Sequence, residues 1–378
     1  MKLEPGEAIL LYEASERDSN IFYATRFLAP DRFIYIRTAE REAIIVSDLE
    51  LDRARAEAQV DEVLPLRLFR QRCKERGVES PKIGEVLDEV LKEFGVSRVI
   101  VPAGFGVKYA DLIRERGYEL RVKDEPFFEE RRRKTPQEVE WIRRAIESTQ
   151  KALERAIRII ADSSIENDLL IYEGEPLTSE RLRREIEISL LEMNCLAKGT
   201  IVACGEQSAE PHKIGSGPLR PNRPIVIDVF PRDLSTGYHA DITRTVVKGK
   251  APEEVKRMFE AVMGAQEMAI GMIKPGADGK EIHSAVVNFF KERGFETGEK
   301  DGRMQGFFHG TGHGIGLDVH EPPALSTESV ELEPGNVITV EPGLYYPDVG
   351  GVRIEDDVLV TEDGCEVLTD FPKTLEIE

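Results

Sequence analysis

Cysteine is scarce in this chain of 378 residues, which contains only four. They are widely scattered, and no two of them form a CxxC pair, so a disulfide framework is not expected. Residues 1–7 also lack the basic segment and apolar run that open a secretory signal. We therefore expect a cytoplasmic protein with free thiols. The cysteines are Cys73, Cys195, Cys204 and Cys365.

Basic residues and long apolar runs are scarce as well. The chain has 51 lysines and arginines against 71 aspartates and glutamates, which leaves a formal net charge of −20. Nucleic acids and anionic membranes select basic surfaces, so neither is expected as a partner. No stretch approaches the roughly 18 apolar residues of a membrane-spanning helix. What remains is a globular composition, 40% hydrophobic and 32% charged, in a chain long enough for two domains.

The first third of the chain alternates short apolar runs with helical patterns, as an α/β layer domain does. No GxGxxG motif follows a strand in this region, so dinucleotide binding is not supported. The expected strands cover residues 8–12, 33–37, 42–46, 97–101 and 119–122, and the expected helices cover residues 83–94 and 108–116.

A charged connector at residues 129–134 separates this region from the rest, and we interpret it as a solvated linker. Residues 135–138, Thr-Pro-Gln-Glu, then form a capping box that starts a long amphipathic helix. We therefore expect an N-terminal domain at residues 1–130 and a second domain at residues 131–378. The second should be α+β, with a mainly antiparallel sheet covered by helices. Its further helices are expected near residues 179–193, 253–273 and 279–293.

One predicted β-hairpin brings two aspartates together. Asp228 interrupts an otherwise apolar strand, and a turn-like segment separates it from a second strand that contains Asp241. Folding the chain between Leu234 and Ser235 places the two aspartates directly opposite each other, with Cβ atoms about 4.5–5.5 Å apart. Two like charges at that distance destabilise a hairpin unless a cation lies between them. Taken alone, this pair is equally compatible with a solvated sheet edge.

A second predicted hairpin repeats the arrangement with glutamates. Folding the chain about Asp348, in a turn with two glycines, places Glu341 opposite Glu355. Two hairpins that each pair acids within apolar strands are difficult to explain without bound cations. The sequence therefore predicts a site with two metal ions.

The segment between the hairpins, residues 309–320, contributes histidines among glycines. Its alternating glycines exclude a stable helix, so His309 and His313 are not the histidine pair of a helical zinc site. Glycine in a strand lets the backbone approach a ligand closely. Histidine combined with several carboxylates suits Mn²⁺, Co²⁺, Zn²⁺ or Fe²⁺ better than Ca²⁺.

From Thr135 to the C-terminus the chain resembles the pita-bread metallopeptidases, the group of prolidase, Xaa-Pro aminopeptidase and methionine aminopeptidase. The resemblance implies an α+β fold with a C-terminal pita-bread catalytic domain. The first domain resembles, more weakly, the α/β domain that precedes it in prolidases, Xaa-Pro aminopeptidases and creatinases, where it helps form a dimer. The signatures are Ala240–Thr245, Gly312–Gly316, Val340–Gly343 and Arg353–Asp356.

The resemblance assigns a role to each candidate residue. Glu341 is the expected general base, and His320 and His212 are expected to stabilise the tetrahedral intermediate or to orient the substrate. His309, Tyr345 and the same two histidines should bind substrate, while Arg353 steadies a ligand aspartate. Two divalent cations are implied, with Mn²⁺ as the first candidate and Co²⁺, Zn²⁺ or Fe²⁺ as alternatives. The implied metal ligands are Asp228, Asp241, His313, Glu341 and Glu355.

The implied reaction is hydrolysis of the peptide bond between an N-terminal residue and proline in short peptides, with a water that bridges the two metals as nucleophile. Dipeptidase relatives often have a basic residue just beyond the second histidine. Residues 321–325 here contain none, which leaves both dipeptides and longer peptides open as substrates.

Alternatives to this function are a peptidase of other specificity, a metal-free creatinase-type hydrolase and a non-catalytic interaction protein. Two further histidines, His239 and His283, are expected to have local, structural roles.

Overall fold

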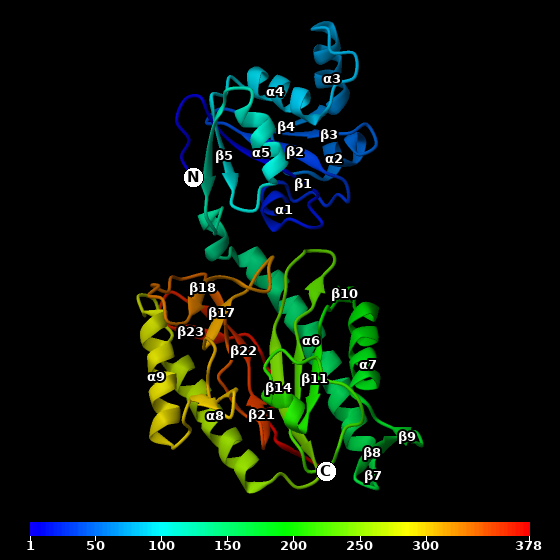
Figure 1. Ribbon diagram of the computed structural model, residues 1–378, viewed down its shortest axis with the longest axis vertical. Coiled ribbons are helices and arrows are strands. Elements are labelled where there is room, and N and C mark those ends of the chain that lie inside the picture. Colours follow the sequence, from blue (N-terminus) through cyan, green and yellow to red (C-terminus); the bar gives the residue numbers. More distant parts are fainter. The chain divides into compact units, whose positions relative to one another are not determined.

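The computed structural model describes all 378 residues (Figure 1). The chain divides into two compact units, Met1–Arg131 and Arg132–Glu378. None of the helices combines the length and apolar character that a membrane crossing requires.

The N-terminal unit is built on a mixed six-stranded sheet with the order β4-β3-β2-β1-β5-β6. Strands β1, β2 and β3 are antiparallel neighbours, whereas β4, β5 and β6 each pair in parallel. The predicted strands are all present, within two residues of their expected ends. The strands are β1 (Glu7–Glu13), β2 (Phe33–Arg37), β3 (Glu42–Val46), β4 (Glu62–Pro65), β5 (Arg98–Pro102) and β6 (Glu119–Lys123).

Helices cover both faces of this sheet, which explains the continuous apolar run of β1. Ile9 and Leu11 pack with residues of α1 and α2, whereas the alternating Ala8 and Leu10 pack with residues of α3, α4 and α5. A strand buried on both faces has no polar side to show in its sequence. The predicted helices α4 and α5 are confirmed, and three further helices were not expected. The helices are α1 (Ser19–Thr25), α2 (Leu51–Glu57), α3 (Leu66–Glu75), α4 (Ile83–Glu93) and α5 (Val107–Arg114).

The C-terminal unit begins with the predicted capping box. The Glu138 backbone N–H donates to the Thr135 hydroxyl at 3.3 Å, and the Thr135 N–H donates to the Glu138 carboxylate at 2.8 Å. The other expected helices are present within one residue of their expected ends. The helices are α6 (Pro136–Asp162), α7 (Ser179–Glu192), α8 (Glu253–Met272) and α9 (Gly279–Glu292), with the short 3-10 turns η1 (Glu129–Arg132), at the chain junction, and η2 (Gly205–Ala209).

Two sheets form the centre of this unit, and their pairings are antiparallel except for that of β14 with β24. Helices α6 and α7 lie beside the first sheet, and α8 and α9 beside the second (Figure 1). The first sheet has the order β11 (Ile201–Cys204), β12 (Ile225–Val229), β14 (Ile242–Lys248) and β24 (Glu376–Ile377). The second has the order β18 (Glu321–Leu325), β17 (Gly312–Gly314), β19 (Val337–Val340), β22 (Asp356–Val360) and β23 (Cys365–Val367).

Short strands complete the unit. The pair β20–β21 continues the two central strands of the second sheet toward the hairpin turn. The remaining strands are β7 (Ser164–Glu166), β8 (Leu169–Tyr172), β9 (Glu175–Pro176), β10 (Cys195–Leu196), β13 (Arg232–Asp233), β15 (Gly298–Lys300), β16 (Arg303–Gln305), β20 (Gly343–Tyr346) and β21 (Gly350–Arg353).

Candidate metal centre

The glutamate hairpin has the predicted register. Val340 pairs with Asp356 on one side of the glutamates, and Gly343 pairs with Arg353 on the other. Both pairs belong to a single register, in which Glu341 faces Glu355. The regular ladder is interrupted between these pairs, where Pro342 has no N–H to donate.

At this interruption the glutamates bond to neighbouring segments instead of to each other. The Glu341 N–H donates to the Thr311 carbonyl at 2.8 Å, and the Glu355 N–H donates to the Thr243 carbonyl at 3.1 Å. Thr311 is two residues from His313, and Thr243 is two residues from Asp241. Backbone bonds therefore connect both glutamates to the segments that carry His313 and Asp241, two of the other predicted ligands.

Gln266 of α8 occupies the space behind the interruption. Its fully buried side chain donates from Nε2 to the Val340 carbonyl at 2.9 Å and to the Ile354 carbonyl at 3.3 Å. These are the carbonyls of the residues that precede Glu341 and Glu355. One amide group thus satisfies a carbonyl of each strand where the ladder between them is broken.

The aspartate hairpin differs from the prediction. Asp228 pairs with Thr243, not with Asp241, so the expected direct opposition of the two aspartates is wrong by two residues. Because side chains alternate along a strand, a shift of two residues keeps both aspartates on the same face. Asp241 lies just before β14 and still points into the site.

The turn of this hairpin explains the shift. Arg232 bridges to His239, which places the centre of the hairpin between Ser235 and Thr236, one residue later than predicted. The Asp233 carboxylate accepts the N–H groups of Ser235 at 2.7 Å and Thr236 at 3.0 Å. This side-chain cap fixes the turn, and a count of residues alone does not reveal it.

Glycines flank His313 because the neighbouring backbone is too close for any side chain. A Cβ atom on Gly312 would lie 1.8 Å from the Thr339 carbonyl oxygen, and one on Gly314 would lie 2.4 Å from the Glu321 carbonyl oxygen. The predicted close approach is therefore present, and it brings β17 against β18 and β19.

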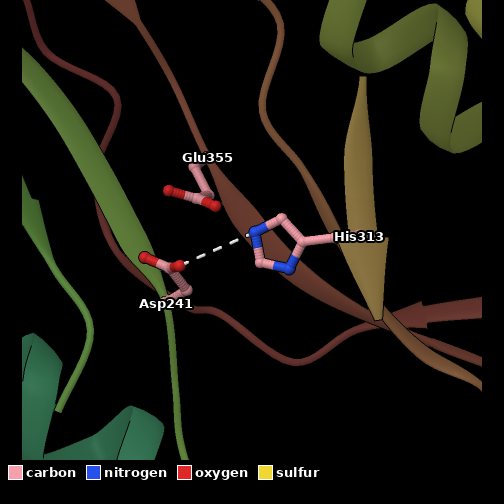
Figure 2. Close-up of side chains that lie close together, drawn as sticks. All are labelled: Asp241, His313 and Glu355. Carbon is pink, nitrogen blue, oxygen red and sulfur yellow. Dashed lines mark ion pairs between the residues drawn. The ribbon is translucent and has the colours of Figure 1, made fainter. Parts of the chain in front are cut away.

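The ligand side chains converge on one point. Figure 2 shows Asp241, His313 and Glu355 directed toward one another, with candidate ligand atoms within 4.8 Å. His313 Nε2 lies 3.8 Å from Asp241 Oδ2 and 3.3 Å from Glu341 Oε1. Asp228 lines the same cavity as these four residues. The structure thus brings together all five residues predicted as ligands.

Three buried carboxylate oxygens of this cluster have no hydrogen-bond partner: Asp228 Oδ1, Asp241 Oδ1 and Glu355 Oε1. An unpaired polar atom is costly to bury, and a charged one far more so. Divalent cations would satisfy all three. Four carboxylates and one imidazole form a donor set that Mn²⁺, Co²⁺, Zn²⁺ and Fe²⁺ accept. The residues present therefore fit the implied metals.

Burial gives the acids unusual proton affinities. It raises the pKa of Asp241 and Glu355 well above the usual range, and the neighbouring carboxylates raise both further. Burial also raises the pKa of Glu341 to about 7, although the Arg353 guanidinium opposes the rise. Without cations the cluster retains protons, so cations binding here would displace them.

The tautomer of His313 follows from its contacts. Its Nδ1 lies 3.1 Å from the Gly314 carbonyl, which only accepts, so Nδ1 carries the proton. Burial lowers the pKa of His313, which keeps the ring neutral. The unprotonated Nε2 then faces carboxylate oxygens that are themselves acceptors. A cation is the partner that suits this group of lone pairs.

Arg353 supports two of the predicted ligands. Its Nη2 donates to Asp228 Oδ2 at 2.7 Å, and its Nε donates to the Thr243 hydroxyl at 3.1 Å. That hydroxyl in turn donates to Glu355 Oε2 at 2.6 Å. The arginine thus contacts one ligand directly, as predicted, and reaches a second through Thr243.

Tyr345 lies behind His309 rather than on the cavity wall. The hydroxyl accepts from Arg353 Nη1 at 2.8 Å and donates to His309 Nε2 at 2.9 Å, while His309 Nδ1 donates to the Gly310 carbonyl at 2.7 Å. Burial lowers the pKa of His309 to about 3, so the ring is neutral. Tyr345 is fully buried and does not line the cavity. It is therefore placed to orient His309 rather than to touch a substrate.

The ligands open onto a cavity of about 1160 Å³. Its lining includes His212, His309 and His320, and the ring centroids of His320 and His313 lie 4.3 Å apart. The predicted substrate-side histidines thus share one cavity with the predicted metal ligands. Its apolar wall is formed by residues that include Ile201, Phe230, Met304, Phe308 and Ala324.

Several supporting residues could not be identified from the sequence. The Thr339 hydroxyl accepts the His313 N–H at 3.1 Å, and the Asp357 carboxylate accepts the Asp241 N–H at 3.1 Å. Thr339 and Asp357 lie two residues from the ligands Glu341 and Glu355 on their strands, which is a weak signal for such a role. Gln266 carries no signal, because it lies on a helix more than 70 residues from either glutamate.

The two histidines expected to be structural lie outside the cavity lining. His283 Nδ1 is 3.0 Å from the Thr311 hydroxyl, and its ring packs against Phe307. The His239 backbone N–H donates to the Gly316 carbonyl at 2.8 Å. Both therefore support the segment around His313.

Curved antiparallel sheets that hold four acids and a histidine, in a chain with an α/β unit before them, define the pita-bread class of metallopeptidases. The sequence model of metallopeptidase family M24 matches residues 140–362, and the chain belongs to this family. Both expectations from the resemblance, the fold and the family, are thus confirmed.

Individual relatives agree with this assignment. The Xaa-Pro dipeptidase of Pyrococcus horikoshii is 30% identical over 376 residues, which cover 95% of this chain and 92% of that protein. The solved Xaa-Pro dipeptidase from Bacillus anthracis superposes with a TM-score of 0.83 at 26% identity, covering 98% of this chain and 95% of that one. The X-Pro aminopeptidase from Thermotoga maritima gives 0.79 at 26% identity, with 98% and 97% covered.

Other curated relatives match over a shorter stretch. The match to the uncharacterized peptidase YqhT of Bacillus subtilis is 37% identical and spans 62% of that protein. The match to the Xaa-Pro dipeptidase of Pyrococcus furiosus, also 37% identical, spans 64% of that protein. The chain thus spans less than two thirds of the length of both.

Proposed function

We propose that this chain is a metal-dependent peptidase that hydrolyses the bond between an N-terminal residue and proline in short peptides. The observation that carries the proposal is the convergence of His313, Asp241 and Glu355, together with the three carboxylate oxygens of the cluster that lack a hydrogen-bond partner. The proline specificity rests on the names of the similar proteins, which include both dipeptidases and an aminopeptidase.

Asp228, Asp241, His313, Glu341 and Glu355 would hold two divalent cations. When bound, these cations would lower the pKa of a water molecule and polarise the scissile carbonyl. Mn²⁺ is our first candidate, and the same donors accept Co²⁺, Zn²⁺ and Fe²⁺. The identity of the metal is therefore a matter for measurement.

Glu341 is our candidate for the group that moves the proton. Its carboxylate lines the cavity beside His313, with Glu341 Oε1 3.3 Å from His313 Nε2, so it lies where a water molecule activated by the cations would be held. The Thr339 hydroxyl lies 3.4 Å from one of its oxygens and limits its rotation. Glu341 takes the proton from the attacking water and delivers it to the leaving proline nitrogen.

The cavity histidines act on the substrate. His320 and His212 are exposed at the cavity that holds the ligands, where their N–H groups would stabilise the tetrahedral intermediate or orient the peptide. His309 has Nδ1 and Nε2 engaged by Gly310 and Tyr345, so it contributes a fixed wall. Tyr345 and Arg353 hold that wall and Asp228 in place.

The proposal is tested by peptide cleavage with chelator-treated protein, before and after addition of Mn²⁺ or Co²⁺. Suitable substrates are Ala-Pro, Ala-Pro-Ala and the proline-free control Ala-Ala-Ala. Metal-restored release of the first residue from the proline peptides alone supports the proposal. Equal cleavage of Ala-Ala-Ala would show that the chain is a peptidase without specificity for proline. Bound metal without any cleavage would contradict enzymatic activity.

Two further expectations can be tested by measurement. The resemblance predicts a homodimer, which the mass of the protein in solution tests directly. It also leaves dipeptides and tripeptides both open as substrates, and the ratio of their cleavage rates separates a dipeptidase from an aminopeptidase.

A further inference from the structure

The charged residues that line the cavity differ in burial and in whether they already have an ion-pair partner. Four of the five acids in the lining are predicted metal ligands, and Arg353 is 4% exposed and bound to Asp228. The other two cations of the lining, Lys213 and Arg303, are 46% and 50% exposed. They are the basic groups of this cavity that a substrate can reach.

These two cations share a single counter-ion. Lys213 Nζ lies 3.6 Å from Glu210 Oε2, and Arg303 Nη2 lies 3.8 Å from Glu210 Oε1. Both distances exceed those of a hydrogen bond. Two positive charges therefore face one negative charge, which leaves an excess of one positive charge and a set of uncommitted N–H donors.

The position of the pair relates it to the substrate-side histidines. Lys213 directly follows His212, and Arg303 begins strand β16, which leads to Phe308 and His309. Two segments about ninety residues apart in the sequence thus each contribute a cation and a histidine to the lining of the cavity.

We infer that Lys213 and Arg303 form a clamp that receives the free C-terminal carboxylate of the peptide substrate. This inference rests on the proposed function, and it names the class of peptide that the cavity takes. One excess positive charge matches one carboxylate, whereas a chain with a net charge of −20 repels polyanions. Glu210 is a competitor that the carboxylate displaces.

The size of the cavity bears on the length of the peptide. Its 1160 Å³ exceeds the roughly 300–1,000 Å³ of ordinary small-ligand pockets. Ala324 is the cross-strand neighbour of His313, and with Gly310 and Ser326 it forms a wall of small residues. This wall leaves room for residues after the proline, so the clamp should favour unblocked peptides of three or four residues.

The test compares peptides that differ only at the C-terminus, Ala-Pro-Ala and Ala-Pro-Ala-amide, on the metal-loaded full chain. The measured quantity is the ratio of kcat/KM for the acid to that for the amide. Exposed ion pairs contribute about twofold to fivefold each, so we expect the wild type to prefer the acid by about fivefold to tenfold. The preference should arise mainly in KM, because the clamp binds substrate and transition state alike.

Three variants separate the clamp from general effects. The double variant Lys213→Gln, Arg303→Gln should bring the ratio to about one, and Glu210→Gln should increase it, because the competing anion is gone. Arg220→Gln is the matched control, since Arg220 is 54% exposed, pairs with Asp168 and lies outside the cavity lining. It should leave the ratio as in the wild type.

The outcomes distinguish the clamp from the proposed function. A wild type that cleaves acid and amide equally, or a double variant that keeps the wild-type ratio, would overturn the clamp while the peptidase proposal stands. A wild type that cleaves no Xaa-Pro peptide, acid or amide, would overturn both. A ratio that falls in the double variant and rises in Glu210→Gln would establish the clamp.

Discussion

The central sheets of the two units bury different kinds of side chain. The N-terminal sheet is covered on both faces by apolar clusters, and Leu10 at its centre is fully buried. The sheets of the C-terminal unit bury Asp228, Asp241 and Glu355, each with an oxygen that lacks a partner. Burial stabilises the first arrangement and destabilises the second unless cations are present. One unit is thus complete as a polypeptide, whereas the other needs an added component.

Replacing a ligand should have the largest effect on this contrast. In Glu355→Gln the amide cannot supply the charge that a cation needs, so we expect kcat/KM to fall by about 10³-fold, or about 4 kcal/mol. The fold should remain, because Glu355 is held by its backbone N–H to Thr243. Cleavage of Ala-Pro-Ala and the circular dichroism spectrum measure the two effects. Wild-type turnover in this variant would exclude the two-metal assignment.

Opening a cavity in the N-terminal core should act on stability alone. Leu10→Ala removes a fully buried side chain, and we expect the free energy of unfolding of that unit to fall by about 3 kcal/mol. Hydrogen exchange resolved by residue should report the loss within residues 1–131. Metal affinity, measured by titration calorimetry, should stay at the wild-type value. A clear loss of metal affinity in Leu10→Ala would show that the apolar core of the first unit also determines metal binding in the second, against the contrast drawn above.

Removing metal should give the complementary result. Cations at about 100 times their Kd stabilise the folded state by about 2.7 kcal/mol, so a chelator should lower the free energy of unfolding by that amount. Hydrogen exchange should speed up within residues 132–378, where the predicted ligands lie, and not within the apolar N-terminal sheet. Uniform acceleration in both regions would count against this view.

The effect of the chelator should grow with pH. A carboxyl group whose pKa is raised by folding stabilises the folded state below its unfolded pKa, and that contribution disappears as pH rises through the folded pKa. The raised values of Asp241 and Glu355, and the value of about 7 for Glu341, place this loss between about pH 4 and neutrality or above. The difference between loaded and chelated protein should therefore be smaller at pH 5 than at pH 8.

Gln266 offers the smallest and most selective change. Gln266→Met keeps the volume of the side chain but removes the donor to the Val340 and Ile354 carbonyls. The next residue in each strand is one of the paired glutamates, and both would be less well positioned. Supporting residues of metal sites contribute about 10- to 100-fold in affinity, and we expect the lower end of that range. The control is Val262→Ala, a buried position of α8 that packs in the core. Equal losses of metal affinity in both variants would reduce Gln266 to an ordinary core residue.

The sequence predicted the glutamate hairpin more accurately than the aspartate hairpin, for a physical reason. The turn near Asp348 is symmetric about its centre, so Glu341 and Glu355 face each other as a count of residues implies. The other turn is set by Asp233, whose carboxylate binds two N–H groups and moves the centre by one residue. Register depends on the chemistry of the turn as well as on its length.

Long-range contacts were beyond any pattern in the sequence. The five predicted ligands could be named because two hairpins pair acids on either side of a histidine- and glycine-rich segment, and because the motifs around them resemble those of the family. Gln266 interrupts a helix in which one polar residue is unremarkable, and Lys213 and Arg303 lie in segments where charges are common. Their roles depend on which segments the fold brings together, and the local sequence does not contain that information.

The backbone bonds from Glu341 to Thr311 and from Glu355 to Thr243 have a consequence for protein engineering. They fix the spacing of the strands through main-chain atoms, so the frame does not depend on which side chains project from it. The projecting side chains could therefore be replaced by softer or harder donors, which would change the metal that the centre prefers. The same backbone frame could thus present different donor side chains, and those side chains would set which metal the centre prefers.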